Sequence, residues 1–429
     1  MSNVFYRSPG SAYPRISHGD GVFLFDTGGK RYLDGSSGAL VANLGHGRAE
    51  IARAMEEQAA RVGFAHTARF TSDAQEELAD RIAGLLPFGL RHSHFVSGGS
   101  EATETAVKLV RQFHLERGEP QRVRILARWA SYHGNSLGAL AASGHISRRQ
   151  PYLPLLSPAF LHFDPPVEGC PGAAPGRLCP CLGSLANALE RADPKSVAAI
   201  ILEPVGGSAD SGLVPHPGYL AGVRRLADAH GVLLISDEVM TGFGRTGEIL
   251  GTVHDAVAPD LITCAKGLSG GYAPLGAVVT NDLVHSAIAN GSGRFAHGFT
   301  YGGHPVACAA GSRALAILED EGLVERSRER GHLLRRGLEE VASRHPLVSR
   351  VRGRGLMQGM VLQTAASPGA RSSSLADIAF DLGLIIYSGS GGADGPLGDH
   401  VLVAPPLVIE ESEIGQLLDL LDQALDELD

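Results

Sequence analysis

The sequence predicts an α/β fold with one large and one smaller domain, and three observations predict it. At 429 residues, the chain is longer than a single compact core usually is. From residue 91 to about 318, apolar strand patterns alternate with helical ones, as in a mostly parallel sheet covered by helices. Two of these apolar runs, 232–237 and 261–266, end on one charged residue, as strands do when they are buried on both faces and deliver a polar group to the sheet edge.

Residues 1–60 are expected to form the N-terminal part of the smaller domain. A hairpin is predicted at 21–34, where Gly28 and Gly29 allow the positive backbone angles of a tight turn. Helices are predicted near 50–60 and 74–86. The second of these lies in the large domain, which we place at 61–318.

The remaining elements follow from apolar spacing. Strands of the large domain are predicted at 122–126, 197–202, 232–235, 261–264 and 276–279. The C-terminal part of the smaller domain, 319–429, should contain a helix at 323–341, extended segments at 348–354, 384–387 and 401–404, and a closing helix. On that helix an apolar stripe should face the core, formed by Ile414, Leu417, Leu418, Leu421, Leu425 and Leu428.

Charge and hydropathy exclude two classes of partner. The net charge of −9 argues against binding to nucleic acid, which needs concentrated Lys and Arg. No apolar run approaches the roughly eighteen residues of a membrane span, and the N-terminal residues lack a signal-peptide core. We therefore expect a cytoplasmic protein with neither membrane nor nucleic acid as a partner.

The five cysteines fall into two groups. Cys264 and Cys308 lie among apolar and small residues and are expected to be buried thiols. Cys170, Cys179 and Cys181 occur in a Pro- and Gly-rich stretch that offers one C-x-C pair and a distant third cysteine. Zinc sites usually show two C-x-x-C-like pairs or histidines at ligand spacing. We therefore predict no metal here and an irregular surface insertion instead.

Two strand ends point to one kind of chemistry. Asp237 ends one apolar run and Lys266 follows the next, so an acid and an amine should face the same crevice. Pyridoxal phosphate (PLP) chemistry needs this pairing, because an acid keeps the ring nitrogen protonated while a lysine forms a Schiff base. The alternative, a buried Asp–Lys ion pair, would add little net stability.

A phosphate needs backbone donors and a helix dipole, and residues 95–111 supply both. Gly98 and Gly99 let the backbone approach closely, and Ser100 can donate its hydroxyl and cap the helix that starts there. The segment is neither a P-loop nor a G-x-G-x-x-G motif. On its own, it could also be a nucleotide loop or merely a helix start.

Three further motifs follow in the chain: Tyr132-His133-Gly134, Glu203 after a buried strand, and His-Gly-Phe-Thr300-Tyr-Gly-Gly-His-Pro. Together with the segments around Ser100, Asp237 and Lys266, they resemble the class III, omega-type aminotransferases of the fold type I PLP enzymes, over nearly the whole chain. That resemblance implies a seven-stranded, mostly parallel sheet between helices, and a smaller α+β domain built from both chain ends. It also implies transfer of an amino group from an amine or amino acid to a keto acid or aldehyde by a ping-pong mechanism.

The resemblance assigns contacts to the cofactor. Gly99 and Ser100 would bind the PLP phosphate, and Thr300 would reach the phosphate of a neighbouring chain, which implies a homodimer with shared active sites. Tyr132 would stack on one ring face, with His133 beside it, and Val239 would form the wall on the other face.

Two acidic or basic groups would act on the substrate. Lys266 would hold the cofactor, be released by the incoming amine and then move a proton. Glu203 would have a secondary electrostatic role, although a structural hydrogen-bond acceptor is about as plausible from sequence. For His297 and His304, hydrogen bonding within the loop is expected rather than catalysis or metal binding.

The chain departs from the family where carboxylates are usually bound. GABA-type relatives carry an arginine where this chain has Asn135. Omega-type relatives carry one near the position where this chain has Tyr387 and Ser388, and in this chain a Gly-rich insertion follows these two residues. Arg352 or Arg354 could replace them, although neighbouring glycines suggest a tight structural crossing. Otherwise the donor lacks an α-carboxylate, as in a polyamine, an amino sugar or a biosynthetic intermediate, and this is the reading we favour.

Two competing functions remain open. The same scaffold could support another PLP reaction, such as racemisation, epimerisation or a decarboxylating transamination, because a fold does not fix a function. A nucleotide-binding or catalytically silent scaffold protein would need no lysine-linked cofactor. The joint presence of Asp237, Lys266, Ser100, Tyr132 and Thr300 argues against a silent scaffold.

Overall fold

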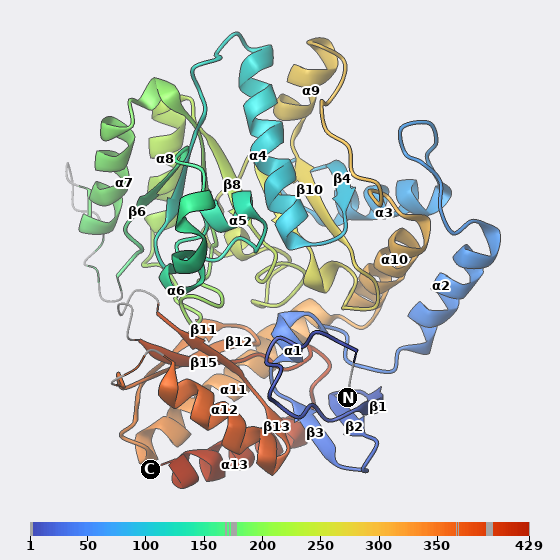
Figure 1. Cartoon of the computed structure of the whole chain (residues 1–429), viewed down its shortest axis with the longest axis vertical. Coiled ribbons are helices and arrows are strands. Elements are labelled where there is room, and N and C mark those ends of the chain that lie inside the picture. Colours follow the sequence, from blue (N-terminus) through green and yellow to red (C-terminus); the bar gives the residue numbers. More distant parts are fainter. Residues whose placement is uncertain are drawn as a thin grey trace.

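The computed structural model describes residues 3–167, 170, 172, 178–365, 367, 369–391 and 398–428. Its largest sheet has seven strands (Figure 1). In spatial order these are β4 (His92–Val96), β10 (Gly276–Thr280), β9 (Leu261–Cys264), β8 (Leu233–Asp237), β7 (Val197–Leu202), β5 (Arg124–Arg128) and β6 (Phe160–Phe163). Neighbours from β9 to β6 run parallel, whereas β10 is antiparallel to both β9 and β4. The predicted α/β fold with a mostly parallel seven-stranded sheet is confirmed.

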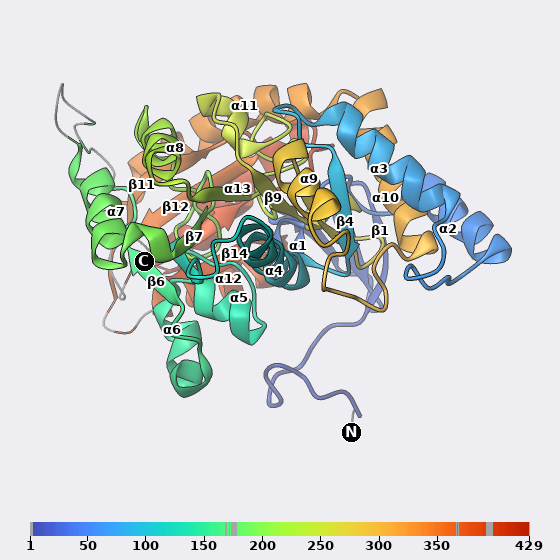
Figure 2. The same cartoon turned by 90° about the horizontal axis from the view of Figure 1, so that it is seen from above.

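Helices cover both faces of this sheet. One face packs against α4 (Gly99–Glu116), α5 (Leu137–Ala142) and α9 (Asp282–Asn290). The other packs, over β5 to β8, against α7 (Pro180–Arg191) and α8 (Tyr219–His230). Figure 2 shows α4 and α8 on opposite sides of the strands. Within β7, Ile201 contributes to the first core and Ile200 to the second, which is why the strand is apolar throughout.

The smaller domain, in the lower half of Figure 1, contains two four-stranded sheets. One is formed by β1 (Ile16–Asp20), β2 (Phe23–Asp26), β3 (Arg31–Asp34) and β13 (Leu384–Ile385), so it joins both ends of the chain. The other is formed by β11 (Val348–Arg354), β12 (Met357–Leu362), β15 (Asp399–Val403) and β14 (Tyr387–Ser390). The packing helices are α11 (Leu323–Arg344), α12 (Ala370–Leu382) and α13 (Glu411–Leu428).

The remaining helices include α1 (Ser37–Leu40), α2 (Ala49–Arg61), α3 (Asp73–Leu85), α6 (Ile146–Arg149) and α10 (Pro305–Asp320). Short 3-10 helices are η1 (Gln150–Leu155), η2 (Pro194–Ser196), η3 (Gly251–Asp255) and η4 (Lys266–Leu268). No helix in the part of the chain that the structure describes is long and apolar enough to cross a membrane.

Most predicted elements are present. The predicted apolar stripe is confirmed on α13, where Ile414, Leu417, Leu421 and Leu425 are buried, and Leu418 and Leu428 are partly buried against the same core. The segment 384–387 is extended as predicted, but it divides between two sheets: β13 pairs with β3, and β14 pairs with β15. Strands β1, β4, β6 and β12 were not predicted, and the domain boundaries at 60 and 318 stay a prediction.

Candidate active site

The polar residues at the strand ends meet in one pocket at the carboxyl edge of the large sheet. Asp237 is the last residue of β8, Glu203 directly follows β7, and Lys266 lies two residues after β9. The pocket has a volume of about 210 Å³ and is lined by Gly99, Ser100, Tyr132, His133, Gly134, Asn135, Glu203, Asp237, Val239, Met240 and Lys266. Eight of the nine residues predicted to bind the cofactor therefore line the same pocket, and Thr300 is the exception.

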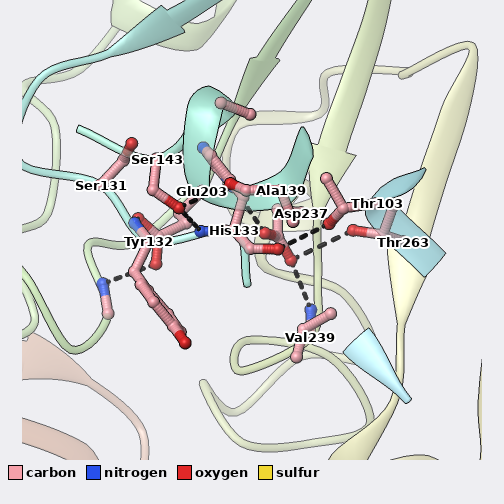
Figure 3. A network of polar contacts seen from close by, with 12 residues as sticks. Thr103, Ser131, Tyr132, His133, Ala139, Ser143, Glu203, Asp237, Val239 and Thr263 are labelled. Atoms are coloured by element: carbon pink, nitrogen blue, oxygen red, sulfur yellow. Dashed lines mark hydrogen bonds and ion pairs between the residues drawn. The ribbon is translucent and has the colours of Figure 1, made fainter. Parts of the chain in front are cut away.

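Asp237 is held by three hydrogen-bond donors (Figure 3). The Nδ1 atom of His133 lies 2.6 Å from its Oδ2 atom. Its Oδ1 atom accepts from the backbone N–H of Val239 and from the hydroxyl of Thr263, both at 3.1 Å. Asp237 is thus hydrogen-bonded to His133 and forms no ion pair with Lys266, so a buried Asp–Lys ion pair is not what these two residues form.

The position of His133 is itself fixed. Its backbone N–H donates to Ser143 Oγ at 2.8 Å, and its carbonyl accepts from Thr103 Oγ1 at 2.8 Å (Figure 3). Among the described residues, its Nε2 atom is buried without a hydrogen-bond partner. The Nδ1 atom of the imidazole is therefore bonded to Asp237, whereas its Nε2 atom lies buried in the site without a hydrogen-bond partner among the described residues.

Lys266 lies in a strained and desolvated position. Its backbone φ angle is +44°, which side-chain-bearing residues rarely adopt, and it opens the short helix η4. Desolvation is the largest effect on Lys266 and lowers its pKa to about 8. The negative charges of Asp237 and Glu203 raise this pKa, and the positive charges of Arg148 and Arg245 lower it further. A sizeable fraction of the amine is therefore uncharged near neutral pH, as a nucleophilic lysine requires.

The N-terminus of α4 contributes Gly99 and Ser100 to the lining of the pocket. The N-cap residue is Gly98, without a side-chain cap, so the capping role predicted for Ser100 is wrong. Instead the Ser100 hydroxyl donates to Asn135 Oδ1 at 2.9 Å and accepts from the Asn135 N–H at 3.0 Å. A Cβ atom at Gly99 would lie 3.0 Å from Val239, so a side chain there would fill the space between the helix end and the valine.

Glu203 is buried beside Tyr132. Its carboxylate accepts from the backbone N–H of Tyr132 at 3.3 Å and from that of Gly207 at 3.2 Å, and burial raises its pKa. Of the two roles expected for Glu203, these contacts support the structural acceptor, although its side chain also lines the pocket.

A second pocket of about 760 Å³ adjoins the first and shares Tyr132, Asn135 and Lys266 with it. Its most notable residue is Arg148, which the sequence analysis missed. The Arg148 guanidinium lies 4.4 Å from the centre of the Tyr132 ring, and its Nη2 atom lies 3.3 Å from the Tyr387 hydroxyl. No motif marks Arg148, and only its place in the segment after Tyr132 could have suggested it.

The arginines considered from sequence do not reach these pockets. Arg352 is 4% exposed and donates to the backbone carbonyls of Ser211 and Asp210 at 3.0 and 2.9 Å. Arg354 lies 3.5 Å from Asp255. Neither residue lines the pocket around Lys266 or the adjoining one, which corrects that alternative. Part of the Gly-rich insertion, residues 392–397, lies outside the described residues.

Thr300 lines neither of these two pockets of its own chain. It is exposed, and the neighbouring Tyr301 is 59% exposed and contacts the exposed Phe64 edge to face at 6.1 Å. His297 Nε2 lies 3.0 Å from Thr105 Oγ1 on α4, so its hydrogen bond joins the loop to a helix and does not lie within the loop as predicted.

The cysteines follow the prediction only in part. Cys264 and Cys308 are buried as predicted, and burial raises the pKa of each thiol to about 12. The surface insertion predicted for the other three is wrong for Cys179 and Cys181, whose side chains belong to the core under α7 and α8. Residues 168, 169, 171 and 173–177 of this stretch lie outside the described residues.

Comparisons with known proteins identify the family. The family model of the class-III aminotransferases matches residues 7–425. An uncharacterized aminotransferase of Bacillus subtilis, YodT, is 36% identical over 97% of this chain and 95% of its own. A putrescine–pyruvate aminotransferase of Pseudomonas aeruginosa is 33% identical over 96% of this chain and 90% of its own.

The fold is also that of solved transaminases. An amine transaminase from an uncultivated Pseudomonas species, solved with PLP bound, superposes with a TM-score of 0.90 and 32% identity, covering 100% of both chains. Family, fold and enzyme class therefore agree with the resemblance in the sequence. The chain belongs to the class III aminotransferases, which transfer amino groups with PLP.

Proposed function

We propose that this aminotransferase holds PLP in the smaller pocket, with Lys266 as the Schiff-base lysine. The observation that carries the proposal is that Asp237, Lys266 and the first residues of α4, Gly99 and Ser100, line one pocket. Gly99 and Val239 lie in contact on this pocket, since a Cβ atom at Gly99 would come within 3.0 Å of the valine, and the missing side chain keeps the start of α4 open to the pocket. When bound, PLP supplies an electron sink for the carbon that bears the amino group.

The chain's own residues orient and hold the cofactor. Asp237, fixed by His133 and Thr263, presents a carboxylate to the ring nitrogen. Ser100 and the free backbone amides at the start of α4 offer donors to the phosphate, where the helix dipole favours an anion. Tyr132 and Val239 would lie on opposite faces of the ring.

Lys266 would move the proton. Its uncharged amine can accept a proton from the substrate carbon, and its pKa of about 8 allows it to return that proton near physiological pH. Desolvation by the surrounding protein makes this possible, since an exposed lysine stays charged.

Arg148 would bind the carboxylate of a keto-acid acceptor. It lines the larger pocket together with Lys266, and its planar guanidinium can bind a carboxylate with two hydrogen bonds. Arg7 lines the same pocket and offers a second cation. Since no arginine occupies either usual position, we propose a donor without an α-carboxylate, such as a polyamine, which the name of the putrescine–pyruvate relative supports.

A homodimer would complete the site, and we propose a cytoplasmic location for it. Thr300 does not line the pocket of its own chain, and the neighbouring Tyr301 and its contact Phe64 leave aromatic surface exposed beside it. Exposed aromatic groups in one area mark a contact with another protein. A second copy of the chain on this face would bring Thr300 to the partner's phosphate.

A single-turnover experiment tests the reaction. The purified enzyme is mixed with a panel of amines and amino acids without any carbonyl acceptor, and pyridoxamine phosphate is quantified. We expect stoichiometric pyridoxamine phosphate with at least one donor and its return to PLP when a keto acid is added. Racemised or decarboxylated product without pyridoxamine phosphate would instead establish another PLP reaction. Conversion of α-amino acids alone would contradict the proposed donor class.

A further inference from the structure

Three cysteines and one histidine meet at the edge of the large domain. Cys170 follows β6, and Cys179 and Cys181 lie at the start of α7. His216 precedes α8 and lies 37 residues after Cys179 in the sequence. The three thiols and one ring nitrogen all lie within 4.8 Å of one another. The histidine is too distant in sequence to form a recognisable motif with the cysteines, which is why the sequence alone predicts no metal here.

From this arrangement we propose that Cys170, Cys179, Cys181 and His216 bind a zinc ion. Four ligands of the Cys₃His type form a closed tetrahedral site, which is characteristic of structural zinc. With Zn–S bonds of about 2.3 Å and a Zn–N bond of about 2.0 Å, the ligand atoms lie roughly 3.5–3.8 Å apart. The Cys179 Sγ atom and the His216 Nε2 atom are already 3.2 Å apart.

The histidine is oriented as a zinc ligand. Its Nδ1 atom lies 3.0 Å from the carbonyl oxygen of Pro217, which can only accept, so the Nδ1–H donates to it. This tautomer leaves the lone pair on Nε2, the atom that faces Cys179. Metal-bound histidines typically donate their other ring N–H in this way. The edge of the Tyr219 ring contacts the imidazole, with ring centres 5.7 Å apart, and holds its plane.

Backbone N–H groups are directed at the sulfur atoms. The Val167 N–H donates to Cys181 Sγ at 3.3 Å, and the Leu182 N–H donates to Cys179 Sγ at 3.5 Å. Such donors stabilise negative charge on sulfur, and Cys179 is also the N-cap of α7, where the helix dipole favours a thiolate. Soft sulfur ligands in a tetrahedral set favour zinc over magnesium or calcium.

The ion would connect three segments of the large domain. It would join the loop after β6, the start of α7 and the loop between β7 and α8. The last of these loops begins at Glu203 and carries Ser208, which lines the larger pocket near Lys266. Zinc would therefore stabilise the helices that pack on one face of the sheet. It would also stabilise the His216 end of the loop between β7 and α8, which contributes Ser208 to the active site, without taking part in the reaction.

The metal content of the purified full-length enzyme tests this inference, and the test does not depend on aminotransferase activity. Protein produced with zinc, iron and copper in the medium is dialysed against metal-free buffer and analysed by mass spectrometry for all three metals. We expect about one zinc ion per chain. The variants Cys170→Ser and His216→Ala change partly exposed residues, and each should lose zinc and unfold at a lower temperature than wild type. Bound PLP shows whether each variant is folded.

Two matched variants sharpen the result. His216→Cys keeps four ligands and should retain zinc, whereas Cys308→Ser, a buried cysteine in another core, should leave the zinc content unchanged. The proposal is overturned if the wild-type protein carries no zinc, or if Cys170→Ser and His216→Ala bind as much zinc as wild type. A disulfide between any two of the three cysteines, found in unreduced peptides, would equally overturn it.

Discussion

The Nδ1 atom of His133 lies 2.6 Å from Oδ2 of Asp237, and both side chains are buried. This contact orients the carboxylate that would face the cofactor ring. It also gives a role to a histidine that the sequence could only place near the cofactor. His133 is therefore a positioning residue for Asp237.

Replacing His133 tests that role. His133→Ala removes one of three donors to Asp237, and a hydrogen bond to a charged group contributes about 1.5–3 kcal/mol. We expect kcat to fall roughly 10–100-fold, with bound PLP retained and its absorption spectrum changed. Ser143→Ala is the matched control, because the Ser143 hydroxyl bonds to the backbone of His133 and of Ala139 and not to the imidazole, and it should have a smaller effect. An unchanged spectrum with wild-type kcat would contradict the role.

Rebinding of PLP to apoenzyme should depend on pH through Lys266. Burial lowers the pKa of Lys266 to about 8, and only the uncharged amine attacks the cofactor aldehyde. The rebinding rate should therefore rise about tenfold per pH unit below that pKa and level off above it. Stopped-flow absorbance between roughly pH 6 and 10 measures this profile, and Lys266→Ala should show neither the profile nor turnover.

Arg148 should shift the same profile. Its positive charge lowers the pKa of Lys266, so Arg148→Gln should move the midpoint of PLP rebinding to higher pH. A midpoint that stays in place or moves to lower pH would mean that the two residues do not interact electrostatically.

Arg148 should also determine acceptor recognition. Loss of a bidentate carboxylate contact costs about 1.5–3 kcal/mol, so Arg148→Ala should reduce kcat/KM for a keto acid roughly 10–100-fold. An aldehyde acceptor, which has no carboxylate, should be much less affected. Arg7→Ala is the comparison, because Arg7 lines the same pocket from another part of the chain. If Arg7→Ala alone selectively impairs keto acids, the carboxylate contact belongs to Arg7.

The sequence correctly predicted where Asp237 and Lys266 lie, because the short apolar runs before them allow only one placement of each residue at a strand end. The Gly98–Ser100 segment was likewise placed at a helix start, although not its capping role. The sequence did not predict the roles of Arg148 and His216. The partners of these residues come from distant segments, Tyr387 for Arg148 and the cysteines for His216. Nothing local marks either residue, since their function depends on tertiary contacts.

The local apolar pattern also could not predict that the segment 384–387 divides between two sheets. Apolar spacing shows that a segment is extended, but the partner of each strand depends on the packing of β3 and β15 from far along the chain. The same limit applies to β6, whose pattern of partly buried residues at the sheet edge is weak.

Hybrid dimers test whether active sites are shared. Lys266→Ala and Thr300→Asp chains, each inactive alone, are co-expressed with different affinity tags, and the doubly tagged hybrid is purified. If Thr300 serves the neighbouring site, one site in each hybrid combines an intact Lys266 with an intact partner Thr300, and about half of wild-type activity should return. If Thr300 serves its own chain, both sites of the hybrid carry a defect and no activity should appear. Its exposed position outside the pocket of its own chain leads us to expect recovery.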